Sequence, residues 1–182
     1  MRRNAGRWIF LVAVVAAAGF ASYALADGGK KTIRETLEGY QEVPALSTPG
    51  NGQFEARIDT DAQEIHYRLS YAGTESAVTQ SHIHLEQQSN NGPIVVWLCS
   101  NLGNGPAGTQ ACPPAPATIE GTISPSDVTA GGAAQGLAAG EFAELVAAIR
   151  AGAMYANVHT VGRPGGEIRA QLASKKHDLD ED

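Results

Sequence analysis

The sequence predicts an all-β fold: an antiparallel, Greek-key-like β-sandwich or barrel of about eight strands with one short helix. Two observations lead to this prediction. From residue 32 to residue 172, short segments alternate apolar and polar residues with a period of two, and turn residues separate them. A single segment instead repeats its apolar residues at helical spacing. About eight short strands suit a sandwich or a closed barrel.

The expected strands follow from the alternation, segment by segment. Each has apolar residues at every second position, and Gly, Pro or Asn residues mark most of the turns between them. The pattern places strands at residues 32–37, 53–58, 64–71, 81–86, 94–98, 117–123, 154–160 and 167–172. The turn at residues 163–166 contains Pro and two Gly residues, so we expect it to return the chain as a hairpin into the last strand.

The helix is expected between the sixth and seventh strands. Gly152 provides a C-terminal stop, and the apolar residues before it recur at helical spacing: Leu137, Phe142, Leu145, Val146 and Ile149. This is one amphipathic helix, and we expect it to pack over an end of the sheet.

The N-terminal segment is typical of a secretory signal peptide. Arg2, Arg3 and Arg7 precede an apolar run from residue 8 to residue 20, and small residues follow up to Ala26. We expect cleavage after Ala26. An uncleaved anchor is the alternative, because the apolar stretch is nearly long enough to span a bilayer.

Two segments remain after the expected cleavage of the leader. Residues 27–173 form the expected domain, with no membrane span, and residues 174–182 form a charged tail that we expect to be disordered. Three of the 13 basic side chains leave with the leader, which gives the remainder a formal charge of −9 against 19 acidic side chains. An acidic surface disfavours nucleic acid as a partner. We expect an extracytoplasmic protein, periplasmic or secreted.

Two cysteines, Cys99 and Cys112, are the only ones in the chain. Both lie in the expected exported portion, where a disulfide can form and persist. We expect a bridge between them, although two free thiols are the alternative that the sequence leaves open.

Four histidines lie in expected strands. In residues 81–86 the apolar set Ile83 and Leu85 marks the side that faces the core, which leaves His82 and His84 on the opposite side. The same test places His66 and His159 in outward sets. We therefore expect histidines on outer, polar strand faces rather than in a buried core.

A His-x-His pair on a strand brings two imidazoles within reach of one ion, and imidazole is the commonest protein ligand for zinc and copper. His159 would complete a set of three if its strand lies beside that of His82 and His84. His66 would be a fourth ligand if its strand were also a neighbour. The competing interpretation is that these are ordinary surface residues.

The segments around these histidines resemble a known family. Ser81 to Leu85, then Gly92 to Leu98, and the ending from residue 151 to residue 172 resemble a CHRD domain, the module named from chordin. The resemblance covers residues 32–173, and the part around His159 is its most specific portion. The family has no settled biochemical activity, so the resemblance identifies the module rather than the function.

A more distant resemblance is to the copper–zinc superoxide dismutases. Their His-x-His strand and late Val-His strand, which supply copper ligands, are matched by His82, His84 and His159. The resemblance implies a copper cofactor and superoxide-dismutase-like redox activity. No histidine lies between His84 and His159, so the bridging imidazole and the zinc loop of those enzymes have no counterpart.

Arg169 is the remaining candidate site residue. It lies in the outward set of the last strand, where it could steer a small anion toward a metal or pair with a carboxylate such as Glu167 or Glu86. The usual hydrolase, nucleotide-binding and metalloprotease motifs are absent from the sequence.

The sequence thus predicts an exported CHRD-domain protein that binds a transition metal through outward-facing histidines, with copper ahead of zinc. The alternative is a metal-free interaction or scaffold module that holds an envelope protein or a polysaccharide. That alternative would use exposed aromatic side chains, for which Tyr40, Trp97 and Tyr155 are the candidates.

Overall fold

A computed structural model describes residues 31–173. The predicted leader at residues 1–26 and the predicted tail at residues 174–182 lie outside these described residues. The described part contains all of the predicted strands and the predicted helix.

Eight strands form, in chain order: β1 (Lys31–Glu38), β2 (Asn51–Asp59), β3 (Glu64–Ala72), β4 (Val78–Leu85), β5 (Ile94–Ser100), β6 (Ala117–Ile123), β7 (Met154–Thr160) and β8 (Ile168–Leu172). The helices are the short 3-10 turns η1 (Gly39–Gln41), η2 (Pro125–Asp127) and η3 (Ala130–Gln135), and the α-helix α1 (Phe142–Arg150). The strand predictions are confirmed to within a few residues at each end.

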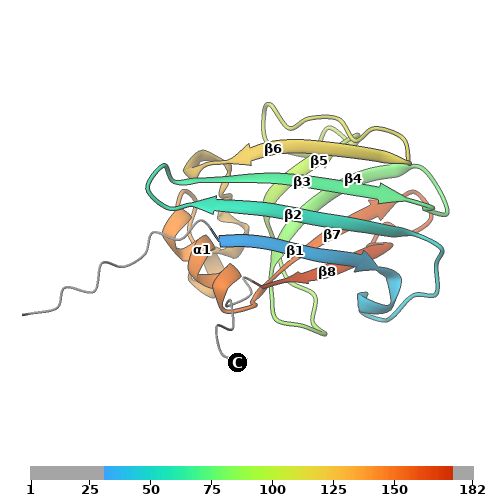
Figure 1. Ribbon diagram of the computed structural model, residues 1–182, viewed down its shortest axis with the longest axis horizontal. Helices are drawn as coiled ribbons and strands as arrows, with labels where there is room; N and C mark the ends of the chain where they lie inside the picture. Colours follow the sequence, from blue (N-terminus) through green and yellow to red (C-terminus); the bar gives the residue numbers. More distant parts are fainter. Residues whose placement is uncertain (1–30, 174–182) are drawn as a thin grey trace, which may run out of the picture.

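The strands form a single eight-stranded antiparallel sheet in the order β5-β4-β7-β8-β1-β2-β3-β6. Figure 1 shows how this sheet curls over between β1 and β8, so that β6, β3, β2 and β1 form one layer and β5, β4, β7 and β8 the other. The predicted all-β sandwich or barrel is therefore confirmed.

The core fills the space between the two layers. It consists of the apolar residues at alternate strand positions, such as Ile33, Leu69, Ile83 and Val158, each at most 1% exposed. Burial of this apolar surface provides the main free energy of folding. Helix α1 lies at one end of the sandwich (Figure 1).

Helix α1 confirms the predicted helix, but it begins later than Leu137, the first apolar residue of the predicted set. It begins at Phe142 and buries Phe142, Leu145, Val146 and Ile149. Leu137 is also buried, but it follows η3, where its backbone N–H donates to Gly132 O. The positive φ of 70° at Gly152 fits the predicted C-terminal stop, because glycine adopts this conformation without steric cost.

The predicted disulfide is also confirmed. Cys99, in β5, is bonded to Cys112 in the following loop, with 5.1 Å between the Cα atoms. The bridge ties the loop that leaves β5 back to that strand. Within residues 31–173, no helix is long and apolar enough to cross a membrane.

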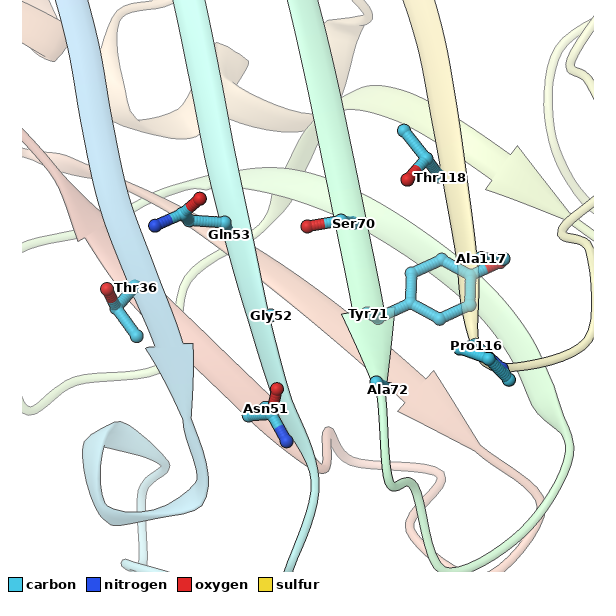
Figure 2. Close-up of a pocket in the computed structure, with 10 residues that line it drawn as sticks. All are labelled: Thr36, Asn51, Gly52, Gln53, Ser70, Tyr71, Ala72, Pro116, Ala117 and Thr118. Atoms are coloured by element: carbon cyan, nitrogen blue, oxygen red, sulfur yellow. The ribbon is translucent and has the colours of Figure 1, made fainter.

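The two layers differ in what covers their outer faces. On the layer of β1, β2, β3 and β6, the outward side chains are solvated, and pairs such as Arg34–Glu55 and Arg68–Glu120 form ion pairs across the strands. A shallow hollow of ≈ 570 Å³ lies on this face, where Figure 2 shows Thr36, Gln53, Ser70 and Thr118 on neighbouring strands. This face follows the predicted alternation of buried and exposed residues.

The other layer does not follow that alternation. All seven residues of β7 are buried, as are the consecutive residues Ser81 to His84 of β4. The competing interpretation, that the outward histidines are ordinary surface residues, is therefore wrong for His82, His84 and His159. They point away from the apolar core, as predicted, but loops cover this outer face.

Candidate metal centre

Three histidines converge on the covered outer face of β4 and β7. His82 and His84 project from the same side of β4 because they are two residues apart. Strand β7 lies directly beside β4, with Gln80 opposite His159 and His82 opposite Asn157. The register brings one potential ligand atom from each imidazole to within 4.8 Å of the other two.

Loops hold two of the imidazoles in fixed orientations. The Nδ1–H of His84 donates to Gly92 O at 2.9 Å, and the Nδ1–H of His159 donates to Pro164 O at 3.0 Å. A carbonyl oxygen only accepts, so the neutral ring in each case carries its proton on Nδ1 and leaves a lone pair on Nε2. This is the arrangement by which backbone carbonyls commonly orient metal-binding histidines.

His82 completes the chain of hydrogen bonds. Its Nδ1 lies 3.2 Å from Nε2 of His159, whose lone pair accepts a hydrogen bond from the Nδ1–H of His82. The Nε2 atoms of His82 and His84 are buried and have no hydrogen-bond partner. A buried polar atom without a partner costs free energy, and a metal ion would satisfy such lone pairs.

Burial sets the protonation state of the cluster. The exposed fractions of His82, His84 and His159 are 0%, 7% and 6%. Burial, followed by the neighbouring His159 and His84, lowers the pKa of His82 to about 2, and burial lowers the pKa of His84 to about 4. The pKa of His159 is also lowered, again mainly by burial. All three rings are therefore neutral at pH 7, as metal ligation requires.

Two aromatic side chains pack against the cluster. The ring of Trp97 meets His82 edge-on, with 4.3 Å between the centroids, and Tyr155 stacks parallel to His84 at 4.6 Å. The expectation that Tyr155 is an exposed docking residue is wrong, because it is 3% exposed. Tyr40 is exposed as predicted, at 68%.

Arg169 lies on the far side of Tyr155 from the cluster. Its guanidinium carbon is 3.5 Å from the centroid of the Tyr155 ring. His84 is stacked on the same ring, and the two groups would collide on one face, so they occupy opposite faces. Tyr155 thus separates Arg169 from His84, and the structure does not bring the guanidinium against the imidazoles.

Arg169 also has partners other than those expected. It donates from Nη1 to Asn91 Oδ1 at 3.2 Å, while its buried Nη2 has no partner. Glu167 is not its partner: that carboxylate accepts from the hydroxyls of Thr48 and Thr160 and from the backbone N–H of Glu75. The predicted pairing of Arg169 with Glu167 is therefore wrong.

His66 is not brought to the other histidines. It lies on β3, which four strands separate from β4 in the sheet order. Its exposed ring contacts Glu64 at 3.2 Å and Thr122 at 3.0 Å. The structure thus groups three of the four candidate histidines.

Sequence reasoning missed the loops that bury the cluster. One signal was present: the outward residues of β7 are Tyr155, Asn157 and His159, which carry no charge at neutral pH, whereas the outward set of β3 contains Arg68. A strand whose outward set has no charged residue is more often covered than solvated. The neighbouring β8 lacks this signal, because its outward set contains the charged but buried Arg169.

Comparison with known proteins identifies the module. A family model described as the CHRD domain matches residues 33–172, which confirms the predicted resemblance. No curated protein matches the chain, and no solved structure does either. The likeness to copper–zinc superoxide dismutases therefore gains no support from these comparisons. The match extends from β1 to the end of β8, and the chain belongs to the CHRD-domain family.

Proposed function

We propose that this protein binds a transition metal ion, copper in preference to zinc, through His82, His84 and His159. One observation carries the proposal: three neutral, buried imidazoles converge within 4.8 Å, and two of them have Nε2 atoms without a partner. The convergence favours metal binding over a metal-free scaffold, in which no such grouping is needed. Copper is preferred because nitrogen ligands bind it more tightly than zinc.

Export of the protein is part of the proposal. A disulfide is present, and disulfides persist in oxidising compartments such as the periplasm or the extracellular space. The sequence features of a signal peptide support the same location. The proposed role is therefore extracytoplasmic metal binding.

The proposal concerns binding rather than superoxide dismutation. Catalysis needs a position for the substrate beside the metal, and Tyr155, Trp97 and the loops at Gly92 and Pro164 surround the imidazoles. Arg169, which could attract an anion, is behind Tyr155. These contacts favour a closed binding site.

Titration of residues 27–182, which retain every described element, tests the proposal. The protein is titrated with Cu(II) and Zn(II) in air and with Cu(I) without oxygen, beside His84→Ala and the matched control His66→Ala. We expect one equivalent in the wild type and in His66→Ala, and loss of that equivalent in His84→Ala with its circular dichroism spectrum unchanged. Absence of stoichiometric binding in the wild type, or equal losses in both variants, would refute the proposal.

A further inference from the structure

We infer that the three-histidine site selects the monovalent ion Cu(I) over Cu(II) and Zn(II). This inference rests on the proposed function and specifies the ion. It follows from three properties of the site: the number of its ligands, its closure to solvent and the charge around it.

The number of ligands favours Cu(I). Among residues 31–173, the group that could hold an ion consists of the three histidines alone, without a carboxylate or a thiolate. The buried carboxylate of Glu167 is engaged with Thr48 and Thr160. Zn(II) almost always takes four ligands, and Cu(II) prefers four or more in a tetragonal arrangement. Cu(I) has a filled d shell and is stable with three.

Solvent does not readily provide a fourth ligand. The three histidines are at most 7% exposed. Trp97 and Tyr155 pack against the rings of His82 and His84, and the carbonyls of Gly92 and Pro164 fix the loops above them. A divalent ion would therefore lack the water that completes its coordination in open sites.

The spacing of the ligand atoms fits a three-coordinate ion. Three nitrogens at about 2.0 Å from a central ion in a plane are about 3.5 Å apart. One potential ligand atom of each imidazole lies within 4.8 Å of the other two, so a modest approach of the rings would bring the three nitrogens to this spacing.

The charge around the site favours the smaller ionic charge. The imidazoles are neutral, so no ligand charge compensates the ion, and the guanidinium of Arg169 lies behind Tyr155. The cost of burying an ion in a medium of low polarity rises with the square of its charge, so a divalent ion costs about four times as much as a monovalent one. Imidazole itself accepts either oxidation state of copper, so charge and coordination number decide.

Competition titrations test this inference. Dissociation constants are measured for Cu(I), without oxygen and against a chromogenic Cu(I) chelator, and for Cu(II) and Zn(II) against chelators of known affinity. We expect Cu(I) to bind at least tenfold more tightly than either divalent ion, with all binding lost in His84→Ala. Equal or tighter divalent binding that His84→Ala abolishes would overturn the choice of Cu(I) and leave the proposed function intact. Absence of binding by all three ions would overturn both.

A second variant tests the argument from charge. Arg169→Met keeps a long side chain against Tyr155 and removes the positive charge. We expect the ratio of Zn(II) affinity to Cu(I) affinity to rise by at least threefold, with the same stoichiometry. An unchanged ratio in a folded variant would overturn the contribution of charge to the selectivity.

Discussion

His82 is the most deeply buried of the three clustered histidines. It is fully buried, its Nδ1 is bonded to His159, and its Nε2 has no partner. An imidazole in this position is kept neutral by burial and is available as a ligand. The cluster therefore differs from an exposed group of histidines, in which protons and metal ions would compete for the imidazole nitrogens near neutral pH.

Metal affinity should consequently resist acidification. The pKa of His84 is lowered to about 4 and that of His82 to about 2, so neither ring is protonated at pH 5.5. We expect the metal dissociation constant to change by less than about threefold between pH 7.5 and pH 5.5. Exposed imidazoles with a pKa of about 6.5 would each lose roughly tenfold over this range. Competition titrations at the two pH values measure the difference, and a hundredfold weakening at pH 5.5 would contradict the account.

Glu42 makes the stability of the fold depend on pH, with the folded state favoured at low pH. It is 8% exposed, and burial raises its pKa to about 7, although a hydrogen bond from Asn157 and the charge of Arg169 act against the rise. The folded state thus binds the proton more tightly than the unfolded state, where the pKa is 4.5. The resulting stability is complete below the unfolded pKa and is lost as the pH rises through about 7.

Glu42→Gln should remove this dependence. Glutamine keeps an acceptor for Asn157 Nδ2, which donates to Glu42 at 2.6 Å, and it carries no charge at any pH. As the pH rises from 4.5 to 8, we expect the unfolding free energy of the variant to increase relative to that of the wild type, by up to about 3 kcal/mol. Urea unfolding at both pH values measures it. A difference that does not vary with pH would show that Glu42 titrates normally.

For single residues, the sequence predicted the direction in which a side chain points better than it predicted the exposure of that side chain to solvent. Alternation correctly placed His82 and His84 on the side away from Ile83, because side-chain direction in a strand is a local property. Burial of that side depends on the loops at Gly92 and Pro164, which directly follow β4 and β7 and fold back over these strands. Periodicity carries no information about such coverage.

At the scale of elements, the loop that follows β4 closes the site. Gly92 accepts from His84, donates from its backbone N–H to the hydroxyl of Tyr155, and follows Asn91, which binds Arg169 and Val43 O. A Cβ atom at position 92 would collide with Leu85 O and Glu86 Cβ. The close approach of this loop to β4 therefore requires glycine.

Gly92→Ala should loosen this loop and weaken the site. The collision forces the loop away from β4, so the variant is expected to lose about 1–3 kcal/mol of stability, the usual cost of overpacking, and to bind the metal less tightly. Gly165→Ala is the matched control in the other covering turn, because a Cβ there meets no atom within 4 Å. Thermal unfolding and metal titration report both effects. Equal behaviour of the two variants would argue against a role for the Gly92 loop.

The elements themselves were largely predictable because their signals are local. Strand β6 was predicted to the residue, and the hairpin between β7 and β8 forms at the predicted turn. The start of α1 was missed because Leu137 shares the helical spacing but lies in the turn after η3. Spacing alone does not distinguish a helical residue from a buried neighbour of the helix.

At the scale of the whole molecule, sheet order creates the site. His82 and His159 are far apart in the sequence and meet because β7 inserts beside β4 and away from β6, its predecessor in the chain. No local pattern specifies that pairing, so the sequence could propose the three histidines but could not establish their proximity. The same order separates His66 from them.

The disulfide acts at this scale as a constraint on the unfolded chain. Cys99 and Cys112 are 13 residues apart, and neither belongs to the histidine group. Replacing both with alanine should lower the free energy of unfolding by about 3 kcal/mol and leave metal stoichiometry unchanged. Guanidinium unfolding and metal titration measure the two quantities. An unchanged unfolding midpoint would contradict the stabilising role, and a loss of stoichiometry in the folded variant would contradict the independence of the site.

The X-ray absorption spectrum of the copper-loaded protein tests the three-histidine site most directly, because it reports the ligands themselves. We predict three nitrogen ligands at about 2.0 Å with the outer-shell scattering of imidazole rings, from the group His82, His84 and His159. A first shell dominated by carboxylate or water oxygens, without imidazole scattering, would contradict the three-histidine site.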